Sequence, residues 1–186
     1  MPMGELRKEL IATLRHAHNK RLPRSKGKDR RGQIPDMLSI HVRPPEIEDR
    51  QFPGHWGGDL IKGEGNASAV GTLVERTSRL VMLVKLPEFK PASATNVLQA
   101  FTDKLLGIAQ PMRLSMTYDQ GREMSMHKKL SEQTGIAVYF CDPHSPWQRG
   151  SNENMNGLVR QYLPKGTDLS IYSQEQLDAI ADEINN

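Results

Sequence analysis

The sequence has little of what marks secreted and membrane proteins. Its 186 residues include a single cysteine, Cys141, which excludes an intramolecular disulfide framework and fits a reducing, cytoplasmic setting. No run of about eighteen apolar residues occurs, which excludes a transmembrane helix, and the first residues are too polar for a secretory signal. The missing apolar run also leads us to expect no membrane partner. A glycine-rich phosphate loop is absent as well, so we expect no nucleotide cofactor.

The charge of the chain is unevenly distributed. Residues 1–31 carry ten Lys or Arg and three Asp or Glu, whereas the remaining residues carry fifteen and nineteen. A basic arm on a mildly acidic body is typical of enzymes that act on nucleic acids. A solubilising tail explains the same distribution equally well, so charge alone does not decide between the two.

The N-terminal part has few features that could build a core. Residues 4–18 place four apolar side chains at helical spacing and predict a short helix. The basic stretch 20–31 is interpreted as an extended linker that follows phosphates. The cations expected to contact DNA there are Lys26, Lys28, Arg30 and Arg31. Residues 32–54 contain four prolines and predict loop, in which Leu38–Val42 can form a short strand. We therefore assign residues 1–53 to an N-terminal helix and basic, proline-containing arm.

Residues 54–186 show the alternation of strands and helices that is expected of a catalytic domain. The predicted strands are Trp56–Ile61, Val70–Glu75, Leu80–Leu86, Leu114–Thr117 and Ala137–Phe140. The predicted helices are Ser93–Ala109, 124–134, Ser151–Tyr162 and Gln174–Ile184, with N-caps at Ser93 and Ser151. Three strands followed by alternating helices and strands predict an α/β fold with a mixed five-stranded sheet and helices on both faces.

Three acidic residues lie where this fold could gather them at one sheet edge. Asp59 lies in the first strand, Asp119 follows the fourth, and Glu153 lies in the first turn of a helix. Each alone has an ordinary explanation, as a surface strand residue, a turn former or a charge that complements the helix dipole. Together they predict a cluster whose mutual repulsion divalent cations remove. Carboxylate oxygens suit Mg²⁺ or Mn²⁺, and two such ions roughly 3.5–4 Å apart serve phosphoryl transfer.

Four stretches of the sequence carry a resemblance to a known family. They are KDRRGQIP at 28–35, PGHW and GDLIKG at 53–63, YDQG and EM at 118–124, and HSPWQRGSNEN, NG and RQY at 144–162. The chain resembles the catalytic core of DDE transposases, in the retroviral-integrase superfamily with a ribonuclease H-like fold. More narrowly, it is similar to the bacterial IS-thirty insertion-sequence group, which also shows thirty-three residues between Asp119 and Glu153.

The resemblance implies a function and a set of site residues. Asp59, Asp119 and Glu153 would be the catalytic residues and would bind two Mg²⁺ or Mn²⁺ ions. The reaction would be DNA cleavage at the ends of a mobile element and transfer of the freed 3′-hydroxyl to target DNA, by a homo-oligomer at the bacterial nucleoid. Arg160 shares a helix face with Glu153 and is expected to point toward DNA phosphates, with a plain surface cation as the alternative.

The chain also departs from this family. Relatives usually have an acidic residue at the position of Gly57, which should change the local electrostatics without removing metal binding. Relatives also carry an N-terminal helix-turn-helix region and a C-terminal basic stretch, so the resemblance implies a core shortened at both ends. Two alternative functions therefore stay open: a nuclease of the ribonuclease H type, and a DNA-binding remnant without catalytic activity.

Overall fold

The computed structural model describes residues 34–186. The predicted helix at 4–18 and the basic arm with Lys26, Lys28, Arg30 and Arg31 lie outside these residues. The proline-containing segment before residue 54 contributes buried apolar side chains, among them Ile34, Ile40 and Ile47. Across the described part of the chain, no helix is long and apolar enough to cross a membrane.

The sheet has six strands, one more than predicted. In chain order they are β1 Leu38–Ser39, β2 His55–Lys62, β3 Ala69–Glu75, β4 Val81–Lys85, β5 Ser115–Tyr118 and β6 Ala137–Phe140. Their spatial order is β1-β6-β5-β2-β3-β4. Strands β1, β6, β5 and β2 pair in parallel in that order. Strand β3 pairs antiparallel with β2, and β4 pairs antiparallel with β3. The additional strand is the short β1, after which the chain turns into a single 3₁₀ turn at Ile40–Val42.

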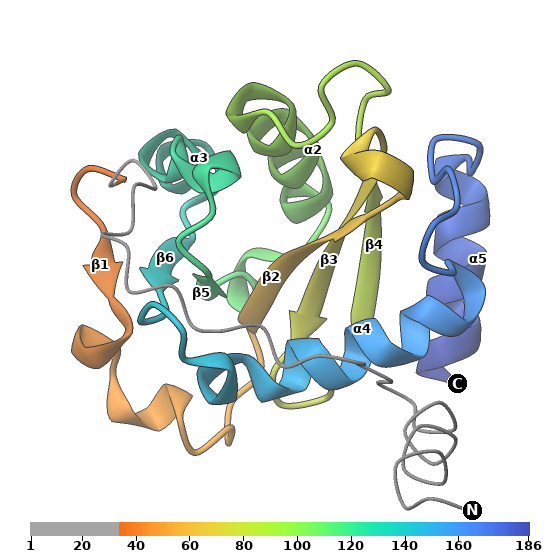
Figure 1. Ribbon diagram of the computed structural model, residues 1–186. Coiled ribbons are helices and arrows are strands. Elements are labelled where there is room, and N and C mark those ends of the chain that lie inside the picture. Colours follow the sequence, from red (N-terminus) through yellow and green to blue (C-terminus); the bar gives the residue numbers. More distant parts are fainter. Residues whose placement is uncertain (1–33) are drawn as a thin grey trace, which may run out of the picture. The chain divides into compact units, whose positions relative to one another are not determined.

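Helices cover both faces of this sheet, as the sequence predicts. The helices are α2 Ala94–Leu106, α3 His127–Thr134, α4 Gly150–Tyr162 and α5 Gln174–Asn185. One apolar cluster packs α2 and α3 against the sheet through side chains such as Phe101 and Leu130, and a second packs α4 and α5 through Val159 and Leu177. Figure 1 shows the two helix pairs on opposite sides of the strands. The fold is therefore a three-layer α/β arrangement.

The helix starts show which capping predictions hold. Ser93 accepts a hydrogen bond from the backbone N–H of Asn96 at 3.3 Å and confirms the predicted N-cap of α2. The predicted cap of α4 at Ser151 is wrong, because α4 already begins at Gly150 and Arg149 occupies the N-cap position. The 3₁₀ turn Pro146–Arg149 leads directly into α4, so the chain is already turning before Ser151. The path of this turn also determines where the Arg149 side chain can reach.

Candidate active site

Asp59 and Asp119 lie side by side because of the strand register. The parallel strands β2 and β5 place Gly57 opposite Thr117, and each aspartate lies two residues further along its own chain. Residues two apart in a strand point to the same face of the sheet, so both carboxylates point to the face that α4 covers. The structure therefore brings together two of the three carboxylates that the sequence analysis grouped, on the face of the sheet that α4 covers.

The guanidinium group of Arg149 lies between the two carboxylates. Its Nη1 atom is 3.3 Å from Oδ1 of Asp59 and 3.5 Å from Oδ2 of Asp119. The Asp59 side chain is only 20% exposed, and burial raises its pKa while the charge of Arg149 opposes this rise. Burial would lower the pKa of Arg149, but the two aspartates more than offset this effect and raise it. A pair of partly buried carboxylates is thus balanced by one cation.

Further hydrogen bonds hold each aspartate in place. Oδ2 of Asp59 accepts a hydrogen bond from the Asn156 side chain of α4 at 2.9 Å, and its Oδ1 accepts one from its neighbour Leu60 N–H. Oδ1 of Asp119 accepts the backbone N–H of Gly121 at 2.9 Å. Each carboxylate therefore has one oxygen directed at Arg149 and one that a neighbouring donor holds. Such preorganised oxygens suit the binding of a cation.

Glu153 is not part of the same side-chain group in this structure. It lies exposed in the first turn of α4, and no group of three His, Cys, Asp or Glu side chains within residues 34–186 lies close enough to hold a metal ion. The α4 residue that touches Asp59 is Asn156, three positions later. Residues three apart on a helix are neighbours on its surface, with Cβ atoms about 5–6 Å apart. Glu153 therefore lies about one helical turn along α4 from the residue that contacts Asp59.

Glu123 is a further carboxylate near the pair that sequence reasoning did not single out. It lies in the 3₁₀ turn Arg122–Met124 after β5, where burial and then the negative charge of Asp119 raise its pKa. A Cβ atom at Gly121 would lie 2.5 Å from a carboxylate oxygen of Glu123, so a side chain there would require the Glu123 carboxylate to move. The motif at 118–124 contains both Asp119 and Glu123, but the sequence alone offers no reason to assign Glu123 a role.

The family model described as "Integrase core domain" matches residues 49–146, which span most of the sheet and the segment leading into α4. The chain belongs to the integrase core domain family. The parallel strands β2 and β5 lie inside that match, together with Asp59 in β2 and Asp119 directly after β5. The ribonuclease H-like fold class expected from the sequence is confirmed by this membership and by the six-stranded architecture.

Curated relatives extend the likeness to almost the whole chain. The transposase for insertion sequence element IS1086 from Cupriavidus metallidurans is 68% identical over 184 residues, covering 99% of this chain and 53% of that protein. The transposase InsI for insertion sequence element IS30A from Escherichia coli K12 is 44% identical over 179 residues, covering 95% and 46%. The chain thus spans about half the length of the curated relatives it matches.

A solved structure supports the fold independently of sequence. The simian T-cell lymphotropic virus intasome in complex with PP2A regulatory subunit B56 gamma contains a chain that matches with a TM-score of 0.56 and 16% identity. The match covers 84% of this chain and 56% of that one. At this identity, the likeness shows that the integrase core fold is shared.

Arg160 is held by the protein backbone in this integrase core. Its Nη2 donates to the carbonyl oxygen of Lys62 at 2.8 Å and its Nη1 to that of Leu163 at 3.3 Å. These bonds tie the end of β2 to the end of α4, so the side chain has a structural role that sequence reasoning did not foresee. Its contact with DNA, like that of the basic arm, stays a prediction. Arg149 and Asn156 lay inside the motif at 144–162, yet only their spatial contacts mark them out.

Proposed function

We propose that this chain is the catalytic core of a transposase that cleaves DNA and transfers the freed strand during transposition. The observation that carries the proposal is the convergence of Asp59 and Asp119 on a single cationic group, on neighbouring parallel strands of an integrase core. Membership in a family whose curated relatives are named transposases supports the reaction class. The substrate is DNA at the ends of an element and at its target, and the setting is the bacterial nucleoid.

The residues present fit a divalent cation. Asp59 and Asp119 direct one oxygen each at the position that the Arg149 guanidinium occupies, and carboxylate oxygens are the ligands that Mg²⁺ and Mn²⁺ prefer. Glu153, one turn from Asn156 on α4, would be the third ligand in this proposal. Two such ions, when bound, supply activation of a water or 3′-hydroxyl and stabilisation of the leaving oxygen.

The chain's own residues have distinct parts in this proposal. Asn156 fixes the orientation of the Asp59 carboxylate, and the N–H of Gly121 does the same for Asp119. Arg149 offsets the negative charge of the pair, a role that a bound cation would take over. Because two ends of an element must be brought together for transposition, we propose that the core acts within a homo-oligomer.

The test is a strand-transfer assay with pre-cut element ends, a supercoiled plasmid and either Mg²⁺ or Mn²⁺. We expect joined products from the unaltered chain and their loss in Asp119→Asn and Glu153→Gln. Glu132→Gln is the matched control, since Glu132 is also an exposed helical glutamate but lies on α3, which covers the opposite face. The control should join DNA at the rate of the unaltered chain.

The other outcomes separate the alternatives. Nicking of the plasmid with no joined product would indicate a ribonuclease H-type nuclease. DNA binding of full strength that ignores both the metal and the Glu153→Gln change would indicate a non-catalytic remnant. Mn²⁺ binding followed by electron paramagnetic resonance tests the ligands directly, and Asp119→Asn should weaken it at least tenfold. Unaltered Mn²⁺ binding in that variant would overturn the assignment of the metal ligands.

A further inference from the structure

Three arginine side chains gather beside the start of α4 with little negative charge to balance them. Arg43 and Arg76 are only 6% and 7% exposed, and the exposed Arg50 lies close enough to depress the pKa of Arg76. Glu48 is the carboxylate that contacts both buried guanidinium groups, with its Oε1 on Arg43 and its Oε2 3.4 Å from Arg76. Its side chain is 61% exposed, so water competes for this single shared negative charge.

The electrostatics of these arginines show the excess of positive charge. Burial, and then the neighbouring charge of Arg76, lower the pKa of Arg43 to about 10. Burial, and then the charge of Arg50, also lower the pKa of Arg76. The buried carboxylate of Glu75 attracts Arg76, but its oxygens already accept four hydrogen bonds from neighbouring backbone and hydroxyl groups. An anion placed among these arginines would relieve their mutual repulsion.

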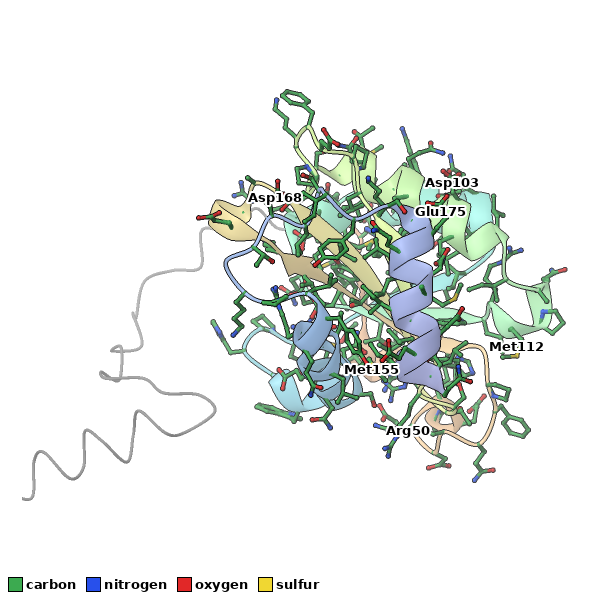
Figure 2. The ribbon with its side chains drawn as sticks, turned by 90° about the vertical axis from the view of Figure 1, so that its right-hand side faces the viewer. Arg50, Asp103, Met112, Met155, Asp168 and Glu175 are labelled. Atoms are coloured by element: carbon green, nitrogen blue, oxygen red, sulfur yellow. The ribbon has the colours of Figure 1, made fainter. Side chains whose placement is uncertain are left out.

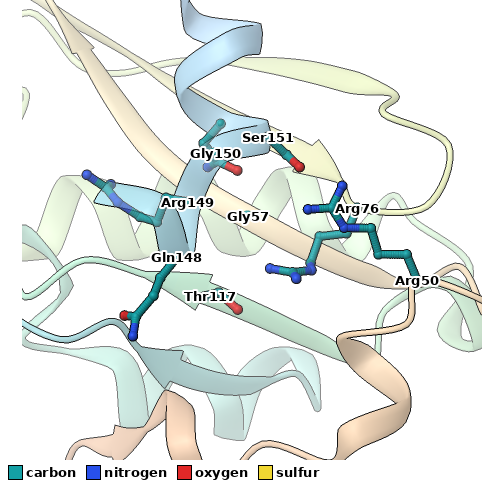
Figure 3. A pocket seen from close by; sticks show the side chains of 9 residues that line it. Arg50, Gly57, Arg76, Thr117, Gln148, Arg149, Gly150 and Ser151 are labelled. Carbon is teal, nitrogen blue, oxygen red and sulfur yellow. The ribbon is translucent and has the colours of Figure 1, made fainter. Parts of the chain in front are cut away.

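Buried donors without partners face a recess at this point. The side chains of Arg76 and Asn152 line it, and Nε of Arg76 and Nδ2 of Asn152 have no hydrogen-bond partner. Asn152 is 3% exposed, so its free amide group is nearly shut off from solvent. The recess has a volume of about 10 Å³, which is room for a single water-sized group such as one phosphate oxygen. Figure 3 shows the Arg50 and Arg76 side chains reaching toward Gly57 and the start of α4.

The recess adjoins a larger cleft that opens along α4. This cleft has a volume of about 290 Å³ and shares Arg50, Gly150 and Ser151 with the recess. Arg79, from the turn between β3 and β4, adds a second exposed cation to its wall, and Met155 adds an apolar surface. Figure 2 shows Arg50 and Met155, the two labelled residues that line the cleft. The first backbone N–H groups of α4 have no helical partner and favour negative charge.

We propose that this cleft and the adjoining recess together form a binding site for a phosphate group of a nucleic-acid backbone, with Arg50 and Arg79 on the wall of the cleft and Arg76 and Asn152 lining the recess at the start of α4. The proposal deepens the proposed function and rests on it for the identity of the nucleic acid as DNA. Arg149 lines the recess and also contacts Asp59 and Asp119, so the site adjoins the candidate metal centre. It would hold the strand next to the phosphate that reacts.

The test measures DNA binding by the whole chain in EDTA, where the metal centre cannot contribute. Fluorescence anisotropy of a labelled duplex is recorded over a range of NaCl concentrations for Arg50→Gln, Arg79→Gln and the control Lys129→Gln. Lys129 is an exposed cation on α3, on the other side of the sheet, and its loss changes the net charge equally. Each cleft variant should bind about five- to tenfold more weakly, with the slope of log K against log salt reduced by about 0.9.

Several results would overturn or support this assignment. Unchanged affinity and salt slope in both cleft variants would overturn it, as would an equal loss in Lys129→Gln. Recovery of the salt slope in Arg50→Lys would support it, because that change keeps the charge. The second experiment measures the melting temperature of the unaltered chain and of the cleft variants in inorganic phosphate. If phosphate stabilises only the unaltered chain while all variants bind DNA equally, the site binds free phosphate and the nucleic-acid assignment is wrong. None of these readouts depends on Mg²⁺, so failure of the metal chemistry would leave them unaffected.

Discussion

Gly57, where the family resemblance leads us to expect an acidic residue, is a position where the structure leaves little room for a side chain. A Cβ atom built there would lie 1.9 Å from Oδ1 of Asn152 on α4. An ordinary contact between a carbon and another heavy atom is about 3.5 Å or more. The change Gly57→Ala therefore requires the Asn152 side chain, or the start of α4 that carries it, to move by about 1.5 Å.

The size of the effect follows from two opposing contributions. Overpacking of a tight interior costs about 1–3 kcal/mol. Replacing a strand glycine by alanine stabilises by about 0.5–1 kcal/mol, because the unfolded chain loses less conformational freedom. We expect a net loss of about 1 kcal/mol in the free energy of unfolding for Gly57→Ala. In a protein that already carries Asn152→Ala, the obstacle is gone and the same change should stabilise by about 0.5–1 kcal/mol.

Urea unfolding followed by circular dichroism of the four proteins in this double-mutant cycle measures the coupling between the two sites. The expected coupling free energy equals the overpacking cost, about 1–3 kcal/mol. Gly150→Ala is the control, because nothing lies within 4 Å of its added Cβ atom, and it should stabilise by about 0.4–1 kcal/mol. A coupling of zero would refute the conclusion that Asn152 closes the space above Gly57.

Three further predictions concern the core and its buried groups. Burial would raise the pKa of Glu75, but hydrogen bonds from Ser78 and other donors outweigh this effect and hold the pKa below its usual 4.5. Glu75→Gln should therefore lower the free energy of unfolding by about 2 kcal/mol near neutral pH. Because a lowered carboxyl pKa gives stability that is lost as pH falls through the folded-state value, the difference in urea midpoint between the two proteins should shrink in acid. Phe101→Ala should cost about 3–5 kcal/mol by calorimetry, whereas the exposed Leu106→Ala should stay within about 0.5 kcal/mol. Burial raises the pKa of Cys141 to about 11, so Ellman's reagent should label this thiol only when urea unfolds the chain; rapid labelling without urea would contradict its burial.

The sequence could predict the central strands and helices because local pattern and tertiary environment agree there. The predicted strand Ala137–Phe140 has the observed bounds, and Ser93 begins α2 as expected. Strand β1 is different. The sequence allowed a short strand at Leu38–Val42, and the structure forms it only at Leu38–Ser39, through parallel pairing with β6 about a hundred positions away in the chain. A pairing of that kind leaves almost no local periodicity, so only the folded chain shows that this strand joins the sheet.

The candidate site could be predicted where strands position it and not where a loop does. Asp59 lies in β2 and Asp119 directly follows β5, and the two meet because the pattern of elements already suggests that these strands are neighbours. The contact of Arg149 with both depends on the path of the 3₁₀ turn at Pro146–Arg149, which no short-range pattern determines. The same path sets the start of α4 and so decides that Asn156, rather than Glu153, touches Asp59.

The strand register explains why cations and carboxylates divide along one face of the sheet. Gly57 and Thr117 stand opposite each other in β2 and β5, and the arginine-lined recess lies over them. Asp59 and Asp119 come two residues later, which is about 7 Å along a strand. Arg149 lines the recess and also contacts both carboxylates. In the proposed function these levels have complementary tasks, because a phosphate backbone needs positive charge to hold it and a metal ion needs negative charge. Since one residue shift in the register of β5 would turn Asp119 to the opposite face, the pairing of Gly57 with Thr117 positions both sites at once.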